Sequence, residues 1–371
     1  MEGHPGAHMK KIAVIAVLII AVLLLMVPGA SLYYESGSGA GCTKCHEMNS
    51  SYDLWHSSSH RDTPCAKCHG GAFTPDVSFH WNNASRVYAH LQGDLPENIR
   101  IRNIDLPAMV TRCQSCHQQE YAQWQSGPHS ATYSRIFLDK THNTNRRLMD
   151  DCLRCHGMHF EGGIRDLVTP LAQTGPWSIV PSELSGRPVI PCLTCHGVHR
   201  LGARLQKTEP EGRLQGGRQE IHRPSLAFFD RRTQKHIPVA ALPLPAMMEG
   251  ERVVRMSPDQ RQALCYQCHA AEANWQVASG DDRTAIGVHE GISCLSCHLK
   301  HGQKTRPSCA ECHPKMSNCG LDVEKMDTTF RSTESKHNIH WVKCLDCHPQ
   351  GVPPKKPHTE VQMPARIAED R

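Results

Sequence analysis

The longest apolar stretch of the chain lies near its N-terminus. Residues Ile12 to Leu32 carry no charged side chain, and the run as far as Val27 is almost wholly aliphatic. A helix of these 21 residues would span about 31 Å, which matches the hydrocarbon core of a bilayer. The pattern predicts a transmembrane helix over residues 12–33.

The residues on either side of this segment predict its orientation. Lys10 and Lys11 precede it, and Tyr33 and Tyr34 follow it, where they suit the second membrane interface. The positive-inside rule places residues 1–11 in the cytoplasm and the rest of the chain outside. We therefore expect a single-pass protein of a bacterial inner membrane, with its main domain in the periplasm.

A cleaved signal peptide is the alternative interpretation of the same segment. Met9, Lys10 and Lys11 resemble the basic start of such a peptide. Against cleavage, the apolar run is long, and Pro28 stands two residues before Ala30, where signal peptidase prefers a small side chain. The anchor is therefore the preferred interpretation.

The chain after this segment contains an internal repeat. Each copy begins with Cys-x-x-Cys-His and continues with Tyr, Trp and His, three residues from Tyr to Trp and five from Trp to His. The residues are Tyr52, Trp55 and His60 in one copy and Tyr121, Trp124 and His129 in the other. Since three residues make about one helical turn, the Tyr and Trp share a face. The repeat predicts a cysteine loop followed by a short helix.

The composition is poor in the usual core-forming residues. Aromatic residues make up only 5% of the 371 residues, whereas there are 19 Cys and 26 His. A side-chain core for a chain of this length would need more Leu, Ile, Val and Phe. We therefore expect something other than side chains to fill the interior.

The spacing of the cysteines indicates what fills it. Eighteen of the 19 Cys form nine Cys-x-x-Cys-His motifs, the attachment signature of c-type haem. The pairs are Cys42/Cys45, Cys65/Cys68, Cys113/Cys116, Cys152/Cys155, Cys192/Cys195, Cys265/Cys268, Cys294/Cys297, Cys309/Cys312 and Cys344/Cys347. Zinc sites and disulfide frameworks do not require a His after every second Cys. We therefore predict nine covalently bound c-type haems.

In each motif the two thiols bond to the porphyrin and the adjacent His binds the iron from one side. These proximal residues are His46, His69, His117, His156, His196, His269, His298, His313 and His348. Cys319 is the one Cys outside the motifs. It is interpreted as a buried or free thiol, with a thiolate ligand to a haem or a redox-active thiol as the alternative.

A second His on the other side of each iron would complete a bis-histidine haem. Some candidates lie four or five residues before a motif, as His60 and His289 do, and we expect these to bind a neighbouring haem. Others follow a motif His by three residues, as His159 does. The candidates are His60, His129, His142, His159, His199, His289, His301, His337 and His340, with His56, His80, His90, His222, His236 and His358 in reserve.

The motifs also divide the chain. We expect a cytoplasmic N-terminus (1–11), the anchor (12–33), a domain with haems one to four (34–165), a segment with haem five and a haem-free insertion (166–264), a domain with haems six to nine (265–349) and a disordered tail (350–371). The insertion is interpreted as an ordered structural loop, with a partner or substrate surface as the alternative. The predicted fold class is a multihaem cytochrome c: mostly short α-helices and irregular loops around packed haems, with one N-terminal transmembrane helix.

The net charge of +5 does not indicate a nucleic acid partner. Each oxidised bis-histidine haem with ionised propionates adds about one negative charge, so nine haems would reverse the sign. We therefore expect no nucleic acid partner, and the sequence leaves the oligomeric state open.

The first two motifs resemble the start of a known family. The stretch Cys42-Thr-Lys-Cys45-His46-Glu-Met48, then Tyr52, Trp55, Ser58 and His60, and then Cys65-Ala-Lys-Cys68-His69 is similar to the opening of the NapC/NirT/NrfH family. A weaker similarity runs from Gly93 to His117, so that the resemblance covers about a third of the chain. Members of the family are membrane-anchored tetrahaem or pentahaem quinol dehydrogenases with one N-terminal helix.

The resemblance implies that the first haem lies near the membrane and faces a quinol, either menaquinol or ubiquinol. It also implies that Met48, two residues after the motif His, is an axial ligand of that haem. Family members can carry a Lys shortly after the second haem, whereas Gly70 to Asn83 contain none. Asp76 and His80 are the candidate proton acceptors of a quinol site in this chain.

The preferred function is therefore transfer of electrons from membrane quinol, through the haems, to a periplasmic redox protein or a membrane redox subunit, with quinol dehydrogenase activity left open. One alternative is a periplasmic conduit without a quinone site. The other is a terminal reductase of a small oxyanion or sulfur compound. A reductase needs an iron with an open position, and all nine motifs supply a proximal His.

Overall fold

The computed structural model describes residues 5–35, 41–71, 74, 77–95, 101–199, 225–270, 284–302 and 339–351. Several predicted residues lie outside these ranges: Asp76, His222, Cys309, Cys312, His313, Cys319, His337 and His358, together with nearly all of the predicted tail. The ranges include eight of the nine motifs.

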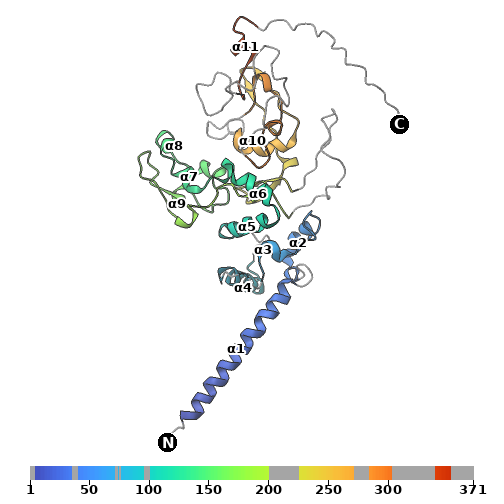
Figure 1. Ribbon diagram of the computed structural model, residues 1–371, viewed down its shortest axis with the longest axis vertical. Coiled ribbons are helices and arrows are strands. Elements are labelled where there is room, and N and C mark those ends of the chain that lie inside the picture. The colour runs from blue at the N-terminus through green and yellow to red at the C-terminus, as the bar shows by residue number, and fades with distance from the viewer. Residues whose placement is uncertain are drawn as a thin grey trace, which may run out of the picture.

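The described residues form short helices and small sheets, apart from one long N-terminal helix (Figure 1). The α-helices are α1 (Pro5–Glu35), α2 (Asn49–His56), α3 (Cys65–His69), α4 (Val77–Gln92), α5 (Leu106–Cys116), α6 (Gln118–Gln125), α7 (Tyr133–Phe137), α8 (Lys140–Asn145), α9 (Ile164–Leu167), α10 (Ala263–His269) and α11 (Cys344–Cys347). The 3₁₀ helices are η2 (Cys42–Lys44), η3 (His46–Met48), η4 (Asn103–Asp105), η5 (Pro128–Ser130), η6 (Asp150–Arg154), η7 (Ser182–Leu184), η8 (Cys192–Thr194), η9 (Val239–Ala241), η10 (Gln260–Gln262), η11 (Gly287–His289) and η12 (Cys294–Ser296). Antiparallel pairs join β1 (Val168–Thr169) to β2 (Ser178–Ile179), β3 (Ala227–Asp230) to β4 (Lys235–Pro238) and β5 (Met248–Glu249) to β6 (Arg252–Val253). Apart from α1, the described residues thus have the short helices and irregular loops that were predicted.

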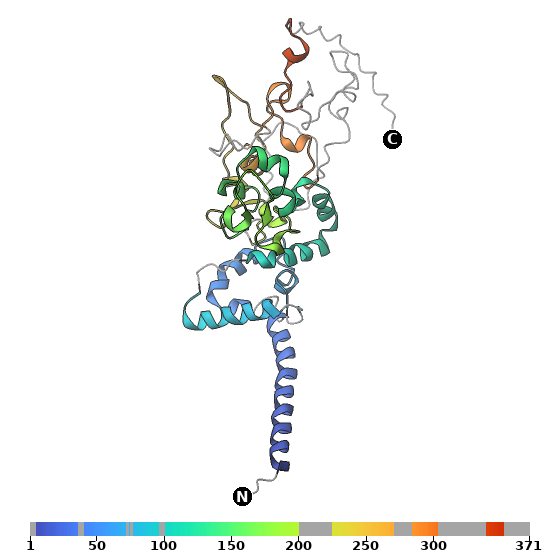
Figure 2. The same cartoon turned by 90° about the vertical axis from the view of Figure 1, so that its left-hand side faces the viewer.

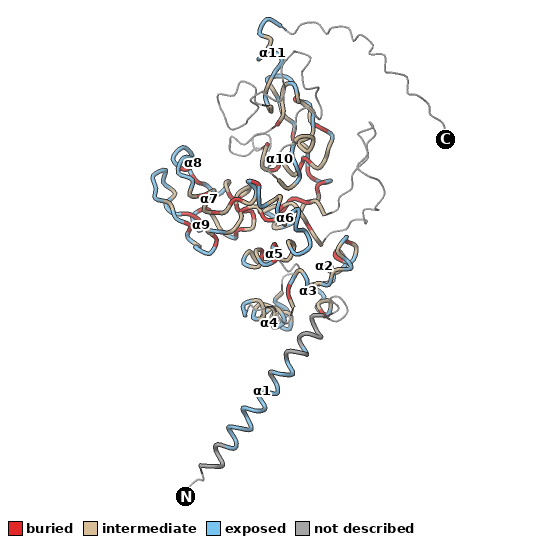
Figure 3. Tube along the Cα trace, viewed as in Figure 1, coloured by how far each residue is buried: buried red, intermediate tan, exposed pale blue. Residues whose placement is uncertain are grey.

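Helix α1 includes the whole predicted apolar segment and extends along the long axis of the molecule, away from the other elements (Figures 1 and 2). Its aliphatic side chains are exposed, from Ile12 at 65% to Met26 at 60% (Figure 3). Counting only the residues that the structure describes, no helix has an apolar run long enough to cross a membrane. The membrane anchor therefore stays a prediction.

The internal repeat forms the predicted pair of short helices. Tyr52 and Trp55 lie on α2 with ring centroids 5.3 Å apart, and Tyr121 and Trp124 lie on α6 with centroids 5.4 Å apart. The interplanar angles are also alike, 47° and 49°. The aromatic spacing therefore predicted both the helices and the shared face.

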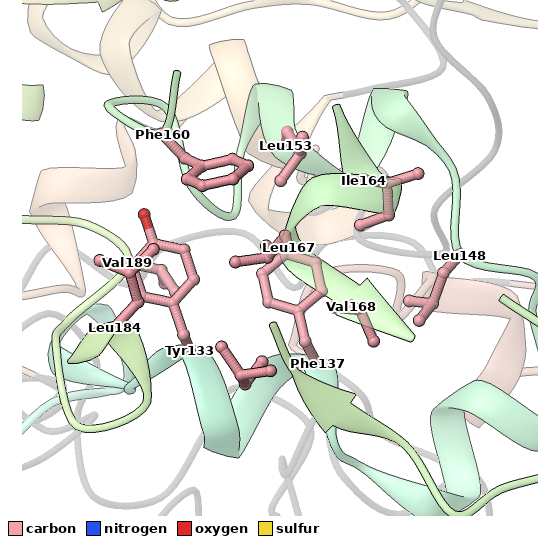
Figure 4. Packing of buried hydrophobic residues seen from close by; sticks show 11 residues of the cluster. Tyr133, Phe137, Leu148, Leu153, Phe160, Ile164, Leu167, Val168, Leu184 and Val189 are labelled. Carbon is pink, nitrogen blue, oxygen red and sulfur yellow. The ribbon is translucent and has the colours of Figure 1, made fainter. Parts of the chain in front are cut away.

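A side-chain core occupies the middle of the chain (Figure 4). It unites α7, α9, the β1–β2 pair and the loops around them, and its members are Tyr133, Phe137, Leu148, Leu153, Phe160, Ile164, Leu167, Val168, Ile179, Leu184 and Val189. The expectation that something other than side chains fills the interior was therefore wrong for this region. Apolar residues are scarce on average along the chain, but they are concentrated in this cluster. Its members come from both sides of the boundary predicted after residue 165, between the domain with haems one to four and the segment with haem five.

The described part of the haem-free insertion packs through a β-hairpin. Strand β3 pairs with β4, and Asp230 holds the turn between them by accepting hydrogen bonds from the backbone N–H groups of Arg232 and Thr233. Phe228 and Phe229 of β3 are buried in a second apolar cluster with Met158, Val239, Leu242 and Ala263. The apolar runs of the insertion thus attach residues 225–242 to the regions of the fourth and sixth motifs.

Two distant segments pair close to the C-terminal motifs. The backbone N–H of Ile286 donates to the carbonyl of His340 at 2.8 Å, and that of Val288 donates to the carbonyl of Val342 at 3.0 Å. Gly287 lies between them with φ +83°, and a Cβ there would lie 2.2 Å from the Val342 carbonyl oxygen. Only glycine permits this close approach, which places His340 beside the seventh motif.

Truncation of the central core should destabilise the protein strongly. Phe137 is 1% exposed, so Phe137→Ala should lower the free energy of unfolding by about 3–5 kcal/mol, because it leaves a cavity. Val180 is 53% exposed, and Val180→Ala should change stability by less than about 0.5 kcal/mol. Denaturant unfolding followed by circular dichroism measures both. Equal, small effects would show that this cluster does not carry stability.

Candidate functional site

Each described Cys-x-x-Cys-His motif forms a single helical turn. The turns are η2, α3, the end of α5, η6, η8, α10, η12 and α11. In five motifs the backbone N–H of the His donates to the carbonyl of the first Cys at 2.9–3.1 Å: His117, His156, His196, His298 and His348. One turn places residues three apart on the same side, so both thiols of a motif can reach one planar ring.

The seventh motif shows how the second Cys is placed when the turn is a short 3₁₀ helix. Cys297 directly follows η12, and its backbone N–H donates to the carbonyl of Cys294 at 3.2 Å. Both thiols are half-buried, and neither is in a disulfide. One turn thus separates Cys294 from Cys297, and covalent attachment of a haem to these two residues stays a prediction.

Within the part of the chain that the structure describes, six motif imidazoles each lie near a second imidazole from another segment. The ring centroids are 5.4–6.2 Å apart, and the pairs are His46–His90, His69–His199, His117–His60, His196–His301, His269–His129 and His298–His340. They include the motif His of the first, second, third, fifth, sixth and seventh motifs. Every one of these partners comes from outside the motif that it faces.

The separation of the rings fits an iron between them. Metal–imidazole nitrogen bonds are about 2 Å long, so two nitrogens on opposite sides of one metal lie about 4 Å apart and their ring centroids about 6 Å apart. Other ring pairs of the chain span a wider range of centroid distances, from 4.0 Å for His159 and Phe229 to 6.3 Å for Trp55 and His56. The paired imidazoles therefore fit bis-histidine ligation of haem iron.

Hydrogen bonds orient two of the partner imidazoles. The Nδ1 atom of His199 donates to the carbonyl of Ser51 at 3.0 Å, and Nδ1 of His90 donates to Oε1 of Glu47 at 2.9 Å. A metal-binding His usually donates its other ring N–H in this way, which leaves Nε2 for the metal. Both rings therefore present Nε2 as the free ligand atom.

Burial keeps several of these imidazoles uncharged. Desolvation, with neighbouring imidazoles second, lowers the pKa of His69 and of His196 to about 4. A neutral imidazole is the form that binds a metal. Desolvation also raises the pKa of the Cys113 and Cys195 thiols to about 11.

Five of the predicted distal candidates belong to the pairs: His60, His129, His199, His301 and His340. His159 instead stacks on Phe229 with its Nε2 atom 3.5 Å from Oγ1 of Thr194. Its pKa falls to about 3 because it is desolvated and lies near His236. His142 is exposed on α8, and His289 lies on η11 beside the paired segment.

His90 is the partner that the sequence placed only in reserve. It lies at the end of α4 and faces His46 of the first motif with ring centroids 5.4 Å apart. Met48, the ligand implied by the family resemblance, lies on η3 next to the same motif. No local spacing indicates His90, since it is 43 residues after Glu47, and only the folding back of α4 brings it there.

The candidate quinol residues are only partly described. His80 lies on α4, and its Nε2 atom donates to the carbonyl of Thr74 at 2.9 Å. Asp76 lies outside the described residues. Thr74 lies beside Gly70, so His80 is held close to the residue that directly follows the second motif.

Neighbouring motifs form a connected series through their thiols. Thiols close enough to interact link the first motif to the second, the second to the third, the third to the fifth and the fifth to the sixth. At the sixth motif the series branches. Cys265 lies beside Cys294 of the seventh motif, and Cys268 lies beside Cys155 of the fourth.

Two family models match the chain, each over less than half of its length. Residues 38–207 match the family of outer membrane cytochromes that is MtrC/MtrF-like, domains II/IV, and residues 220–299 match cytochrome c554 and c-prime. Neither match is to the NapC/NirT/NrfH family, so that resemblance stays a prediction.

No curated protein and no solved structure matches the chain. The two family matches include seven of the nine motifs, five in the first and two in the second. Both matched families consist of cytochromes that carry several c-type haems. The chain is therefore a multihaem c-type cytochrome, a protein of electron transfer.

Proposed function

We propose that this cytochrome is anchored in the inner membrane by α1, binds nine haems, and carries electrons from membrane quinol to a periplasmic redox partner. The observation that carries the proposal is the connected series of motifs, which begins just after α1 and continues to the fourth and seventh motifs. A series of this kind conducts over a long distance, whereas a single redox site does not.

The residues of the chain have three tasks in this function. The motif cysteines fix each ring to a helical turn, and the paired imidazoles hold the metal from both sides. When bound, each haem supplies reversible one-electron redox chemistry. The buried side chains around the motifs exclude water, as the desolvation of His69 and His196 indicates.

The position of the first motif supports electron entry from the membrane. Cys42 follows the end of α1 at Glu35 by seven residues, and α1 contacts α3 of the second motif. Figures 1 and 2 both place α2, α3 and α4 at this end of α1. A quinol headgroup would lie at the same depth as these elements if α1 spans the bilayer, and His80 and Asp76 are the proposed proton acceptors.

A conduit without a quinone site is the second candidate function. Both matched families are described as cytochromes, and neither description mentions a quinol. In this case a membrane redox subunit would supply the electrons to the first motif. A terminal reductase has less support, because at six motifs a second imidazole faces the motif His, and an iron held between two imidazoles would have no open position for a substrate.

The haem content is directly measurable. Denaturing mass spectrometry of the holoprotein should give a mass that exceeds the polypeptide by nine haems, because thioether bonds survive denaturation. Loss of the second Cys of one motif, as in Cys268→Ala, should weaken attachment at that site alone. A mass excess of seven haems or fewer would contradict full occupancy of the motifs.

The ligand of the first haem can be tested with a pair of variants. His90→Ala should convert one of nine haems from low spin to high spin, because it removes one axial nitrogen, whereas Met48→Leu should leave the spectrum unchanged. Electron paramagnetic resonance of the oxidised protein measures the change. The matched control is His142→Ala, which removes an exposed imidazole. The opposite result, with Met48→Leu effective and His90→Ala silent, would favour the ligand that the family resemblance implies.

Direct quinol oxidation is tested with the full chain in liposomes. Added menaquinol should reduce several haems, which the haem absorption bands report, and His80→Ala should slow the reaction without changing the spectrum of the oxidised protein. Liposomes with an already oxidised menaquinone are the control. If menaquinol reduces no haem unless a membrane partner is added, the conduit function replaces quinol oxidation.

A further inference from the structure

Helix α4 exposes its apolar side and not its polar side. Val77, Trp81, Tyr88 and Leu91 are 84%, 75%, 66% and 74% exposed. They recur at spacings of four, seven and three residues, which places them in one stripe along the helix. We call these four residues the α4 stripe.

The polar residues of α4 face the protein. His90 donates to Glu47, and His80 donates to the carbonyl of Thr74, both at 2.9 Å. The exposed positions of α4 carry no charged side chain: Val77, Ser78, Trp81, Ala84, Ser85, Val87, Tyr88, Leu91 and Gln92. A helix on a water-soluble surface has the opposite arrangement, with its apolar face inward. The α4 stripe therefore needs an apolar environment outside the protein.

The position of α4 indicates which environment that is. The two views show α4 lying across the direction of α1, at the end of α1 that joins the rest of the molecule (Figures 1 and 2). The exposed aliphatic residues of α1, from Ile12 to Met26, lie along the part of this helix that extends away from α4 (Figure 3). The exposed apolar residues of α1 thus follow the long axis of the molecule, and those of α4 lie across that axis at one end of α1.

The chemistry of the stripe fits a lipid headgroup layer. Trp and Tyr are enriched where hydrocarbon meets water, because each has an apolar ring and a polar group. A helix with one apolar face lies in the plane of this layer and buries that face by about 5–10 Å. Trp81 and Tyr88, the two central residues of the α4 stripe, are of this kind.

We propose that α4 is an interfacial helix that lies flat on the phospholipid bilayer, with the α4 stripe among the headgroups and upper acyl chains. Since His90 is on the opposite side of α4, contact with the bilayer also sets the height of the first motif above the membrane. The proposal concerns lipid only, and it holds whichever compound donates the electrons.

Depth measurements on the full holoprotein in nanodiscs of phosphatidylethanolamine and phosphatidylglycerol test this proposal. A ketone-bearing residue at position 84, Ala84→p-acetylphenylalanine, takes a nitroxide label between Trp81 and Tyr88. The matched control is Lys140→p-acetylphenylalanine, at an exposed position of α8. Collision rates with oxygen, which enters lipid, and with a polar nickel complex, which does not, report the environment of each label.

The ratio of oxygen to nickel collisions should be several-fold higher at position 84 than at position 140. It should fall when Trp81→Ser and Tyr88→Ser are introduced together, while the haem spectrum stays unchanged. Equal ratios at the two positions would show that α4 lies in water. Short distances between two position-84 labels in dipolar spectra would show that a second copy of the chain covers the stripe. Either result overturns the proposal, and a label at Ser85 repeats the test if the first variant loses haem.

Discussion

The pairing of six described motif imidazoles with imidazoles from distant segments is the constraint on which the rest of this structure depends. A motif can fasten a ring to one helical turn, but it supplies only one ligand, and the second comes from another part of the chain. The six pairs therefore act as cross-links: His60 joins the first part of the chain to the third motif, and His129 joins the third to the sixth. In a chain with few strands and short helices, these links determine which motifs become neighbours.

At the first motif, helix α4 connects the pairing of imidazoles with the exposed surface of the protein. Helix α4 carries His90 on its inward side and Trp81 on its outward side, so one element faces both a candidate metal centre and the surroundings of α1. Glu47 strengthens the arrangement, because its carboxylate accepts a hydrogen bond from His90 and is 7% exposed. A shift of α4 would therefore disturb the first centre.

In the middle of the chain, apolar side chains pack together and connect the elements around the fourth motif, which belongs to none of the six imidazole pairs. The cluster around Phe137 and Leu167 joins α7, α9 and the short β1–β2 pair, and the β3–β4 hairpin adds Phe228 and Phe229 beside Met158. Both clusters border the fourth motif. The fourth motif is in turn a neighbour of the sixth, since Cys268 lies beside Cys155.

The sequence by itself determined what is covalent and local. Cys-x-x-Cys-His specifies attachment within one helical turn, and the Tyr-to-Trp spacing specified α2 and α6, because both patterns involve residues within a turn or two of each other. Spacing near a motif also indicated His60, His199, His301 and His340. Only the tertiary structure decided which motif each of these imidazoles faces, because that depends on how segments far apart in the sequence return to one another. The same reason explains His90, which no local spacing indicates, and the side-chain core, since average composition does not report where the few apolar residues gather.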